Sequence, residues 1–255
     1  MAIELSRVDE FALITLNRPE ALNALSSALL RDLGEAIDAA GASDARALLF
    51  IGAGAKAFCA GADIKELAGR TPAQHKAAME FGQQMFAKLD RLRVPSVAIV
   101  NGYAFGGGLE LALACNFRVG TRSAKMGLPE IKLGLIPGYG GTQRLPRIVG
   151  EARALEMIMT GRTVDAEEAQ RIGLLNRLLE GEALAGGLAF VREFSVHSLV
   201  VLDCARSAVK RALDNPIYEG LKVEADISGL VYGTRDAAEG MAAFMEKRKA
   251  RFEDA

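Results

Sequence analysis

Two carboxylates, Glu110 and Glu130, are the side chains whose positions best suit acid/base chemistry. Glu110 follows three consecutive glycines at the expected start of a helix, and Glu130 follows Pro129 in a loop rich in apolar residues. Poor solvation raises the pKa of a carboxyl group toward the range useful for proton transfer. Two ordinary alternatives remain open, in which Glu110 only offsets a helix dipole and Glu130 only occupies a surface turn. The apolar neighbours expected around Glu130 are Met126, Leu128, Ile131, Leu133 and Leu135.

The triple glycine, Gly106 to Gly108, predicts a turn from a strand into a helix. An apolar, β-branched stretch precedes it at 94–102, and the helix-favouring run LELALAC follows it at 109–115. The first N–H groups of a helix have no partner within the helix and carry the positive end of its dipole. We therefore expect free backbone N–H groups at Gly106 to Gly108, suited to a developing negative charge.

Other common catalytic patterns do not fit the sequence. The phosphate-binding pattern GxxxxGK[ST] and the nucleophile pattern GxSxG are missing, and His75 and His197 lie far apart without clustered ligands, so no metal site is expected. Gly52, Gly54 and Ala57 match the spacing of a dinucleotide-binding turn. However, we predict a loop over 56–60 where that fold requires a helix. Proton transfer is therefore assigned to carboxylates.

Composition limits the partners and the compartment. Over 255 residues the formal net charge is −1, which argues against bulk binding to nucleic acid or to an anionic membrane. No stretch approaches the length of a membrane span, and the N-terminus lacks the apolar core of a secretory signal. Three widely spaced cysteines, Cys59, Cys115 and Cys204, argue against a disulfide framework and favour a reducing cytoplasm.

Hydrophobic periodicity predicts alternating strands and helices over roughly the first 180 residues, and only helices beyond Glu182. A hairpin is expected over 3–16. Further strands are expected at 45–52, 117–121 and 174–179, and helices at about 27–40, 72–92, 152–160 and 165–172. A short helix should begin near Asp63, which we interpret as a structural cap. The loop-rich segment 125–150 is predicted to be functional. The last helix is expected to extend over 236–252.

Three segments carry a family resemblance: FCAGADIKEL at 58–67, VNGYAFGGGLELALACNFRV at 100–119, and GLPEIKLGLIPGYGGTQRLPRIVG at 127–150. In order and spacing they resemble the characteristic segments of the enoyl-CoA hydratase (crotonase) family, and both ends of the chain are also similar. The resemblance implies an α/β fold, a crotonase-like spiral of ββα units with a C-terminal helical trimerisation region. It implies a core over residues 1–195, and an association region over 196–255 that forms homotrimers or hexamers.

The resemblance also implies the site residues. Glu110 and Glu130 match the two catalytic glutamates, and the backbone N–H groups of Ala62 and Gly107 match the oxyanion hole. The positions matching the family's contacts to coenzyme A are Ala60, Ala62, Asp63, Ile64, Lys65, Phe244 and Lys247. Coenzyme A belongs to the acyl-CoA substrate, so no separate cofactor and no metal are expected.

The implied reaction is syn addition of water to a 2-trans-enoyl-CoA, giving a 3-hydroxyacyl-CoA in fatty acid β-oxidation or related metabolism. Alternatives within the fold are an enoyl-CoA isomerase or a hydratase of a specialised acyl-CoA. An alternative from another class is a non-catalytic, RNA-binding relative, which the short basic run at 247–251 supports poorly. Met126, Leu128 and Leu109 depart from the commonest family pattern and put the acyl preference in doubt.

Overall fold

The computed structural model describes residues 2–255. The chain divides into two compact units, 1–189 and 190–255. The first unit contains all the strands of residues 2–255, and the second is helical. The domain limits inferred from the sequence, 1–195 and 196–255, stay a prediction.

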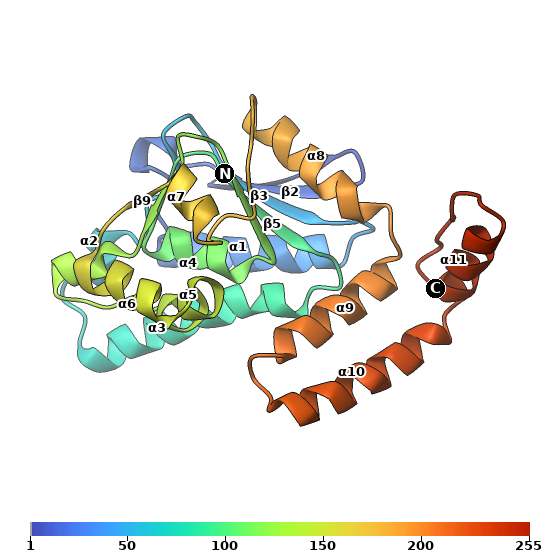
Figure 1. Ribbon diagram of the computed structural model, residues 1–255. Coiled ribbons are helices and arrows are strands. Elements are labelled where there is room, and N and C mark those ends of the chain that lie inside the picture. Colours follow the sequence, from blue (N-terminus) through green and yellow to red (C-terminus); the bar gives the residue numbers. More distant parts are fainter. Residues whose placement is uncertain (1) are drawn as a thin grey trace. The chain divides into compact units, whose positions relative to one another are not determined.

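Two sheets form the frame of the first unit (Figure 1). The six-stranded sheet has the order β1-β2-β3-β5-β7-β10, with β1 and β2 antiparallel and the other neighbours parallel. The four-stranded sheet has the order β4-β6-β8-β9, in which only β8 and β9 are antiparallel. The strands of the large sheet are Ile3–Val8, Phe11–Leu16, Leu48–Gly52, Ser96–Val100, Phe117–Gly120 and Arg177–Leu178. Those of the small sheet are Ala57–Cys59, Tyr103–Phe105, Lys125–Gly127 and Val164–Asp165.

The chain alternates between the two sheets. Each of the pairs β3/β4, β5/β6 and β7/β8 places its first strand in the large sheet and its second strand in the small one, and helical segments follow each pair. This repeat is the predicted spiral of ββα units. It brings the ends of β4, β6 and β8 together, so segments far apart in the sequence meet beside the small sheet.

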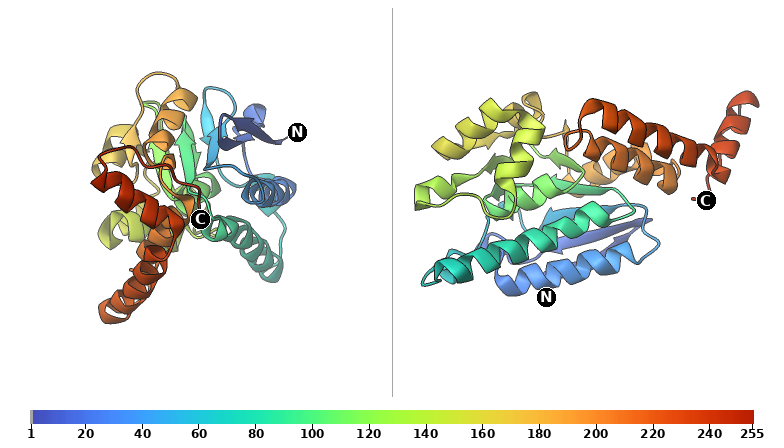
Figure 2. Two further views of the ribbon diagram at one scale, coloured as in Figure 1. Left: turned by 90° about the vertical axis from the view of Figure 1, so that its right-hand side faces the viewer. Right: turned by 90° about the horizontal axis from the view of Figure 1, so that it is seen from below.

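Local capping accounts for the helices that the sequence predicted well. Ser26 caps α1 (Ser27–Gly41) by accepting a hydrogen bond from the Leu29 N–H group at 3.2 Å. Thr71 forms a capping box with Gln74 at the start of α3 (Pro72–Ala87), which continues into the 3-10 turn η2 (Lys88–Arg91). The two helices pack side by side (Figure 2). Both start signals depend on neighbours in sequence, so they were predictable.

Two predictions about local structure, at residues 57–59 and 103–105, were wrong. Residues 57–59, predicted as loop, form β4, and a separate strand, β6, lies between β5 and the triple glycine. Part of the loop-rich segment forms the 3-10 turn η3 (Pro129–Leu133) and the helix α5 (Gly141–Val149). Strands of three residues are too short to show periodicity, and these are stabilised by pairing with one another.

The remaining helices of the first unit lie as expected. α6 (Glu151–Thr160) ends at Gly161, which adopts the left-handed conformation, and α7 (Ala166–Arg171) is capped by Asp165. The 3-10 turn η1 (Pro19–Ala21) follows β2. α4 (Gly107–Ala114) is buried throughout and contacts both α3 and α5.

The second unit contains the end of α8 (Ala183–Ser195), then α9 (Leu199–Arg211), α10 (Ile217–Tyr232) and α11 (Arg235–Met245). α11 ends earlier than predicted. Lys247 has a φ of 53°, which ends the helix, and the following residues fold back so that the Glu253 N–H group donates to Asp236 at 2.7 Å. No single helix among residues 2–255 is long and apolar enough to cross a membrane, although the bent pair α8 and α9 meets the length and composition criteria together.

Candidate active site

Glu110 lies in the first turn of α4 and is 2% exposed. Its Oε1 atom accepts hydrogen bonds from the backbone N–H groups of Tyr139 and Gly141, each at 2.7 Å. Its Oε2 atom accepts no hydrogen bond within residues 2–255. The two N–H donors fix the carboxylate from the segment preceding α5 and leave one oxygen for a ligand.

The buried position of Glu110 changes its acidity. Burial raises its pKa to about 7, and the charge of Glu130 acts in the same direction. The N–H donors of Gly141 and Tyr139 and the charge of Arg144 oppose the shift without cancelling it. Glu110 can therefore change protonation state near neutral pH.

Glu130 lies in η3, where the left-handed Gly134 ends the turn. Its Oε2 atom is fully buried and has no hydrogen-bond partner within residues 2–255. Burial raises its pKa as well. Both carboxylates lie beside the turn into α4, because Glu130 Oε1 faces Gly106 and Glu110 lies in the first turn of that helix. A buried carboxylate oxygen without a partner is costly, so such an atom indicates a site that a ligand completes.

The expected apolar surroundings of Glu130 were partly wrong. Met126 and Leu128 are fully buried, but Ile131 is 42% exposed and Leu133 is 55% exposed. The turn η3 directs these two side chains outward. The Glu130 side chain instead lies against Gly106, where an added Cβ atom would stand 2.9 Å from its Oε1 atom.

The triple-glycine turn supplies fewer free N–H groups than predicted. The Gly106 N–H group donates to the Gly127 carbonyl at 3.0 Å, so the prediction of a free N–H group at this residue was wrong. The cause is the pairing of β6 with β8, which continues into the turn. The N–H groups of Gly107 and Ala62 donate to no acceptor within residues 2–255.

Close backbone contact places these two free N–H groups in the same region. Gly108 packs so tightly against β4 that an added Cβ atom would lie 2.0 Å from the Cys59 carbonyl oxygen. At Gly61 the corresponding Cβ atom would lie 3.5 Å from the Gly107 nitrogen. The segment carrying Ala62 is anchored on its other side, because Leu25 donates to Gly61 and accepts from Asp63. The glycines therefore permit an approach that any side chain would prevent.

The predicted coenzyme-binding residues fall into two groups. In the first unit, Asp63 caps α2 (Ile64–Leu67) through the Lys65 N–H group at 3.2 Å, which confirms the expected structural role of Asp63. Ile64 is 58% exposed, and Lys65 is also exposed. The Ala60 N–H group is already bonded to the Leu22 carbonyl at 3.0 Å.

The other two coenzyme-binding candidates belong to the second unit. Phe244 lies near the end of α11 and is 85% exposed, and Lys247 lies just beyond that helix and is exposed. Their role in binding coenzyme A stays a prediction.

Residues that orient Glu110 were missed by the sequence analysis. Tyr139 and Gly141 act through backbone N–H groups, and Arg144 donates to the Tyr139 carbonyl at 3.1 Å. The available signal was the sequence Tyr-Gly-Gly: Gly140 has a φ of 113°, and Gly141 begins α5. Within residues 2–255 no group of three or more His, Cys, Asp or Glu side chains could hold a metal ion.

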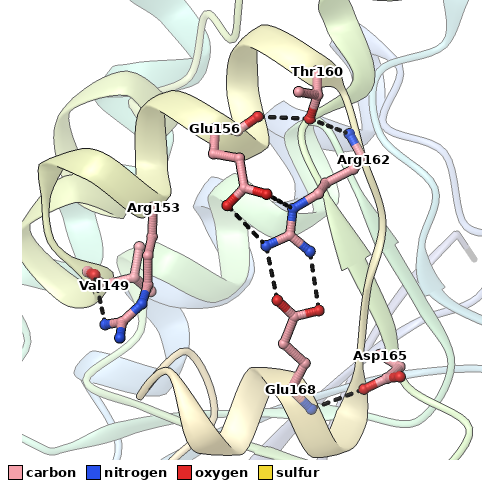
Figure 3. Close-up of polar contacts among 7 residues, drawn as sticks. All are labelled: Val149, Arg153, Glu156, Thr160, Arg162, Asp165 and Glu168. Atoms are coloured by element: carbon pink, nitrogen blue, oxygen red, sulfur yellow. Dashed lines mark hydrogen bonds and ion pairs between the residues drawn. The ribbon is translucent and has the colours of Figure 1, made fainter.

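A charged cluster supports the segment that precedes Glu130 (Figure 3). Arg162 binds Glu168 through two hydrogen bonds of 3.0 and 2.8 Å, and its Nε atom lies 2.9 Å from Glu156. The cluster joins α6 to α7 across β9. The Arg162 carbonyl oxygen would lie 2.9 Å from a Cβ atom at Gly127, so this joined element packs directly against β8.

The fold and site define a class of protein: a two-sheet spiral that holds one buried and one partly buried carboxylate near backbone N–H donors without an acceptor within residues 2–255. The family model for enoyl-CoA hydratase/isomerase matches residues 7–255, and the chain belongs to this family.

Relatives match along nearly the whole chain. A probable enoyl-CoA hydratase of Rhizobium meliloti (strain 1021) is 44% identical over 241 residues, covering 94% of this chain and 93% of the relative. The crotonyl-CoA hydratase of Syntrophomonas wolfei is 39% identical, and the match covers 98% of this chain and 97% of the relative. The crystal structure of enoyl-CoA hydratase from Bacillus anthracis superposes with a TM-score of 0.94 at 35% identity and covers all of both chains. These similarities confirm the predicted crotonase fold.

Proposed function

We propose that the protein is an enoyl-CoA hydratase, a hydro-lyase that adds water to a 2-trans-enoyl-CoA and forms a 3-hydroxyacyl-CoA. The observation that carries the proposal is the pair of carboxylates. Glu110 is held by two N–H groups with one oxygen left over, and Glu130 has a buried oxygen without a partner. The names of the full-length relatives support the same reaction.

In the proposed mechanism the thioester oxygen accepts hydrogen bonds from the N–H groups of Ala62 and Gly107. That oxygen gains negative charge as the enolate forms, and fixed donors stabilise the charge without reorganising. One such donor is typically worth about 3 kcal/mol in the transition state. Within residues 2–255 neither N–H group donates to another acceptor, which supports this role.

The two carboxylates divide the proton transfers. Glu110 takes a proton from the water molecule as the water oxygen bonds to C3, and Glu130 delivers a proton to C2. The raised pKa values of both groups favour these roles, because an acid or base works best when its pKa lies near the working pH. No group beyond the two carboxylates and the two N–H donors is needed, so the proposal includes no separate cofactor.

Incubation of the purified protein with crotonyl-CoA tests the proposal. The conjugated enoyl thioester should lose its absorbance, and mass spectrometry should show a product heavier by one water molecule. An isomerase would instead move the double bond without a change in mass. Unchanged crotonyl-CoA and longer 2-enoyl-CoA substrates would refute the hydratase assignment. Binding of RNA that is weakened by salt and unaffected by coenzyme A would favour the non-catalytic alternative.

The location and assembly complete the proposal. We place the enzyme in the cytoplasm, which is supported by the three cysteines, because none of them forms a disulfide bond within residues 2–255. We also propose a homotrimer or a hexamer. The second unit presents large apolar side chains to solvent, each at least 65% exposed, as expected of an association surface: Val209, Leu213, Ile217, Tyr218, Leu230, Tyr232, Phe244 and Met245.

The oligomer can be measured directly. Light scattering coupled to size exclusion should give three or six times the chain mass of 27.1 kDa. Leu230→Glu on α10 should shift this mass downward, because a charge would replace an apolar side chain that is 74% exposed in the isolated chain. A wild-type mass of 27.1 kDa across the micromolar range would contradict the assembly.

The pH dependence follows from the raised pKa of Glu110. A base must be ionised, so kcat/KM should fall about tenfold per pH unit below a midpoint at the Glu110 pKa of about 7. Glu130 must carry a proton in order to deliver it to C2, so kcat/KM should also fall on the alkaline side, and Glu130→Gln should abolish this alkaline fall. Steady-state rates between pH 5 and 9 would measure both midpoints. An alkaline fall that persists in Glu130→Gln would contradict the role of Glu130 as the acid.

A further inference from the structure

The ring of Tyr139 fills the space between two helices of the first unit beside the candidate site. On one edge, a Cβ atom at Gly82 of α3 would lie 2.4 Å from its Cδ1 and Cε1 atoms. On the other edge, a Cβ atom at Gly107 of α4 would lie 3.1 and 3.2 Å from its Cδ2 and Cε2 atoms. The Phe86 ring meets it edge to face, with ring centroids 5.7 Å apart. Tyr139 is 5% exposed, so its ring closes the space between α3 and α4 at the level of the free Gly107 N–H group.

Hydrogen bonds to α3, α4 and α5 fix the main chain of the segment that carries the ring. The Tyr139 N–H group donates to Glu110, and its carbonyl accepts from Arg144. The preceding residue, Gly138, accepts a hydrogen bond of 2.8 Å from the Gln83 side chain on α3. These bonds fix the main chain of Tyr139, and the packing of its ring against Gly82, Gly107 and Phe86 opposes a rotation of the ring about its χ1 bond. The ring of Tyr139 is therefore held rigidly between α3 and α4.

Packing, rather than the hydroxyl group, sets the position of the ring. The Tyr139 hydroxyl has no hydrogen-bond partner within residues 2–255, and burial raises its pKa to about 12, so it stays neutral. Phenylalanine at this position would keep the same packed ring. This provides a matched control for the size of the side chain.

An acyl chain bound in the proposed way must pass this ring. Its C1 carbonyl oxygen lies at the Gly107 N–H group, and its C3 atom lies within reach of Glu110, so the first carbons follow the first turn of α4. Carbons beyond these would extend toward the face of α4 that carries Gly107, where the Tyr139 ring packs. A short chain ends before the ring, whereas a longer one requires the volume that the ring occupies.

We propose that Tyr139 is a specificity-determining residue that closes the acyl site and restricts this enzyme to short-chain acyl-CoA substrates. The proposal rests on the hydratase function for its placement of the acyl group. It concerns the size of the site, so it can be tested by binding alone, with saturated acyl-CoA thioesters that cannot be hydrated.

The test compares dissociation constants of butyryl-CoA and octanoyl-CoA by calorimetry. The wild-type protein should bind octanoyl-CoA about tenfold or more weakly than butyryl-CoA, because the longer chain meets the ring. In Tyr139→Ala the preference should reverse, with octanoyl-CoA binding about tenfold or more tightly, because its additional methylene groups become buried. Tyr139→Phe should keep the wild-type ratio.

Two results would overturn the proposal: tighter binding of octanoyl-CoA than of butyryl-CoA by the wild-type protein, or an unchanged ratio in Tyr139→Ala. If Tyr139→Ala does not fold, Tyr139→Leu can replace it, because leucine fills only part of the space. Tyr139→Leu should move the ratio of the two dissociation constants in the same direction. An unchanged ratio in Tyr139→Leu would also overturn the proposal. Since these measurements involve no turnover, they are independent of the crotonyl-CoA assay. If the protein prefers butyryl-CoA to octanoyl-CoA as expected but hydrates no enoyl-CoA, the hydratase function is refuted and the role of Tyr139 is not.

Discussion

Replacement of Glu110 or Glu130 by glutamine is expected to lower kcat by at least about a hundredfold, the usual scale for a positioned acid or base. Glutamine has nearly the same shape but neither accepts nor delivers a proton at neutral pH. In Glu110→Gln the amide oxygen can still accept the hydrogen bonds from Tyr139 and Gly141, so the local structure should persist. The loss should therefore appear in turnover, with the affinity for a saturated acyl-CoA nearly unchanged.

Stability measurements separate this loss from misfolding. The folded-state pKa of Glu110 lies near 7 rather than near the ordinary value of 4.5, so its stabilising contribution is present below pH 4.5 and is lost as the pH rises through 7. At pH 8 the buried charge costs up to about 3 kcal/mol, the equivalent of that pKa difference. Glu110→Gln should thus melt at a higher temperature than the wild-type protein at pH 8, and the difference should shrink toward pH 4.5.

A matched control uses the same chemical change at a position outside the site. Glu35 lies on an exposed part of α1. Glu35→Gln should therefore change neither turnover nor melting temperature appreciably. Near-normal turnover in Glu110→Gln or Glu130→Gln would remove that residue from the mechanism. A lower melting temperature for Glu110→Gln at pH 8 would contradict the buried-charge argument.

Gly108→Ala is expected to have the largest structural effect of any single methyl addition near the site. Its Cβ atom would lie 2.0 Å from the Cys59 carbonyl oxygen and 2.7 Å from the Cys59 carbonyl carbon, so backbone must move away from backbone. Alanine favours a helix over glycine by about 1 kcal/mol. Overpacking against main-chain atoms costs about 3 kcal/mol or more and outweighs that gain.

The movement forced by this methyl group should also separate the two free N–H donors. Gly107 moves with α4 and Ala62 moves with the segment after β4, and a displacement of about 1 Å in a catalytic group can cost about a hundredfold in rate. We therefore expect folded Gly108→Ala to lose both stability and turnover. Chemical denaturation and a crotonyl-CoA assay at a temperature where the variant is folded would measure the two effects.

Gly220→Ala is the matched control for this change. Gly220 lies in α10, and no heavy atom lies within 4 Å of an added Cβ atom. Gly220→Ala should therefore leave the stability of the protein unchanged or raise it by up to about 1 kcal/mol. Wild-type stability and turnover in Gly108→Ala would show that the contact between α4 and β4 relaxes easily, and would contradict the requirement for glycine.

Structure that depends on neighbours in sequence was predictable, whereas structure that depends on distant segments was not. Thr71 caps α3 through a residue three positions away, and Asp63 caps α2 through one two positions away, so both were predicted correctly. The strand at 57–59 exists because it pairs with β6, more than forty residues later in the chain, and it was predicted as loop. The Gly106 N–H group was predicted to be free for the same reason, since its acceptor, Gly127, belongs to another turn of the spiral.

By itself, the sequence determined the chemical groups and their local settings: a glutamate in the first turn of a helix, a second glutamate after proline, and glycines where backbones must approach each other. Only the tertiary structure decided which of these groups meet. The fold joins Glu110 to the N–H groups of Tyr139 and Gly141, leaves one Glu130 oxygen buried without a partner, and wedges the Tyr139 ring between α3 and α4. The physical reason is that pKa values, free N–H groups and filled space depend on what is nearby after folding, and here the neighbours come from separate turns of the spiral.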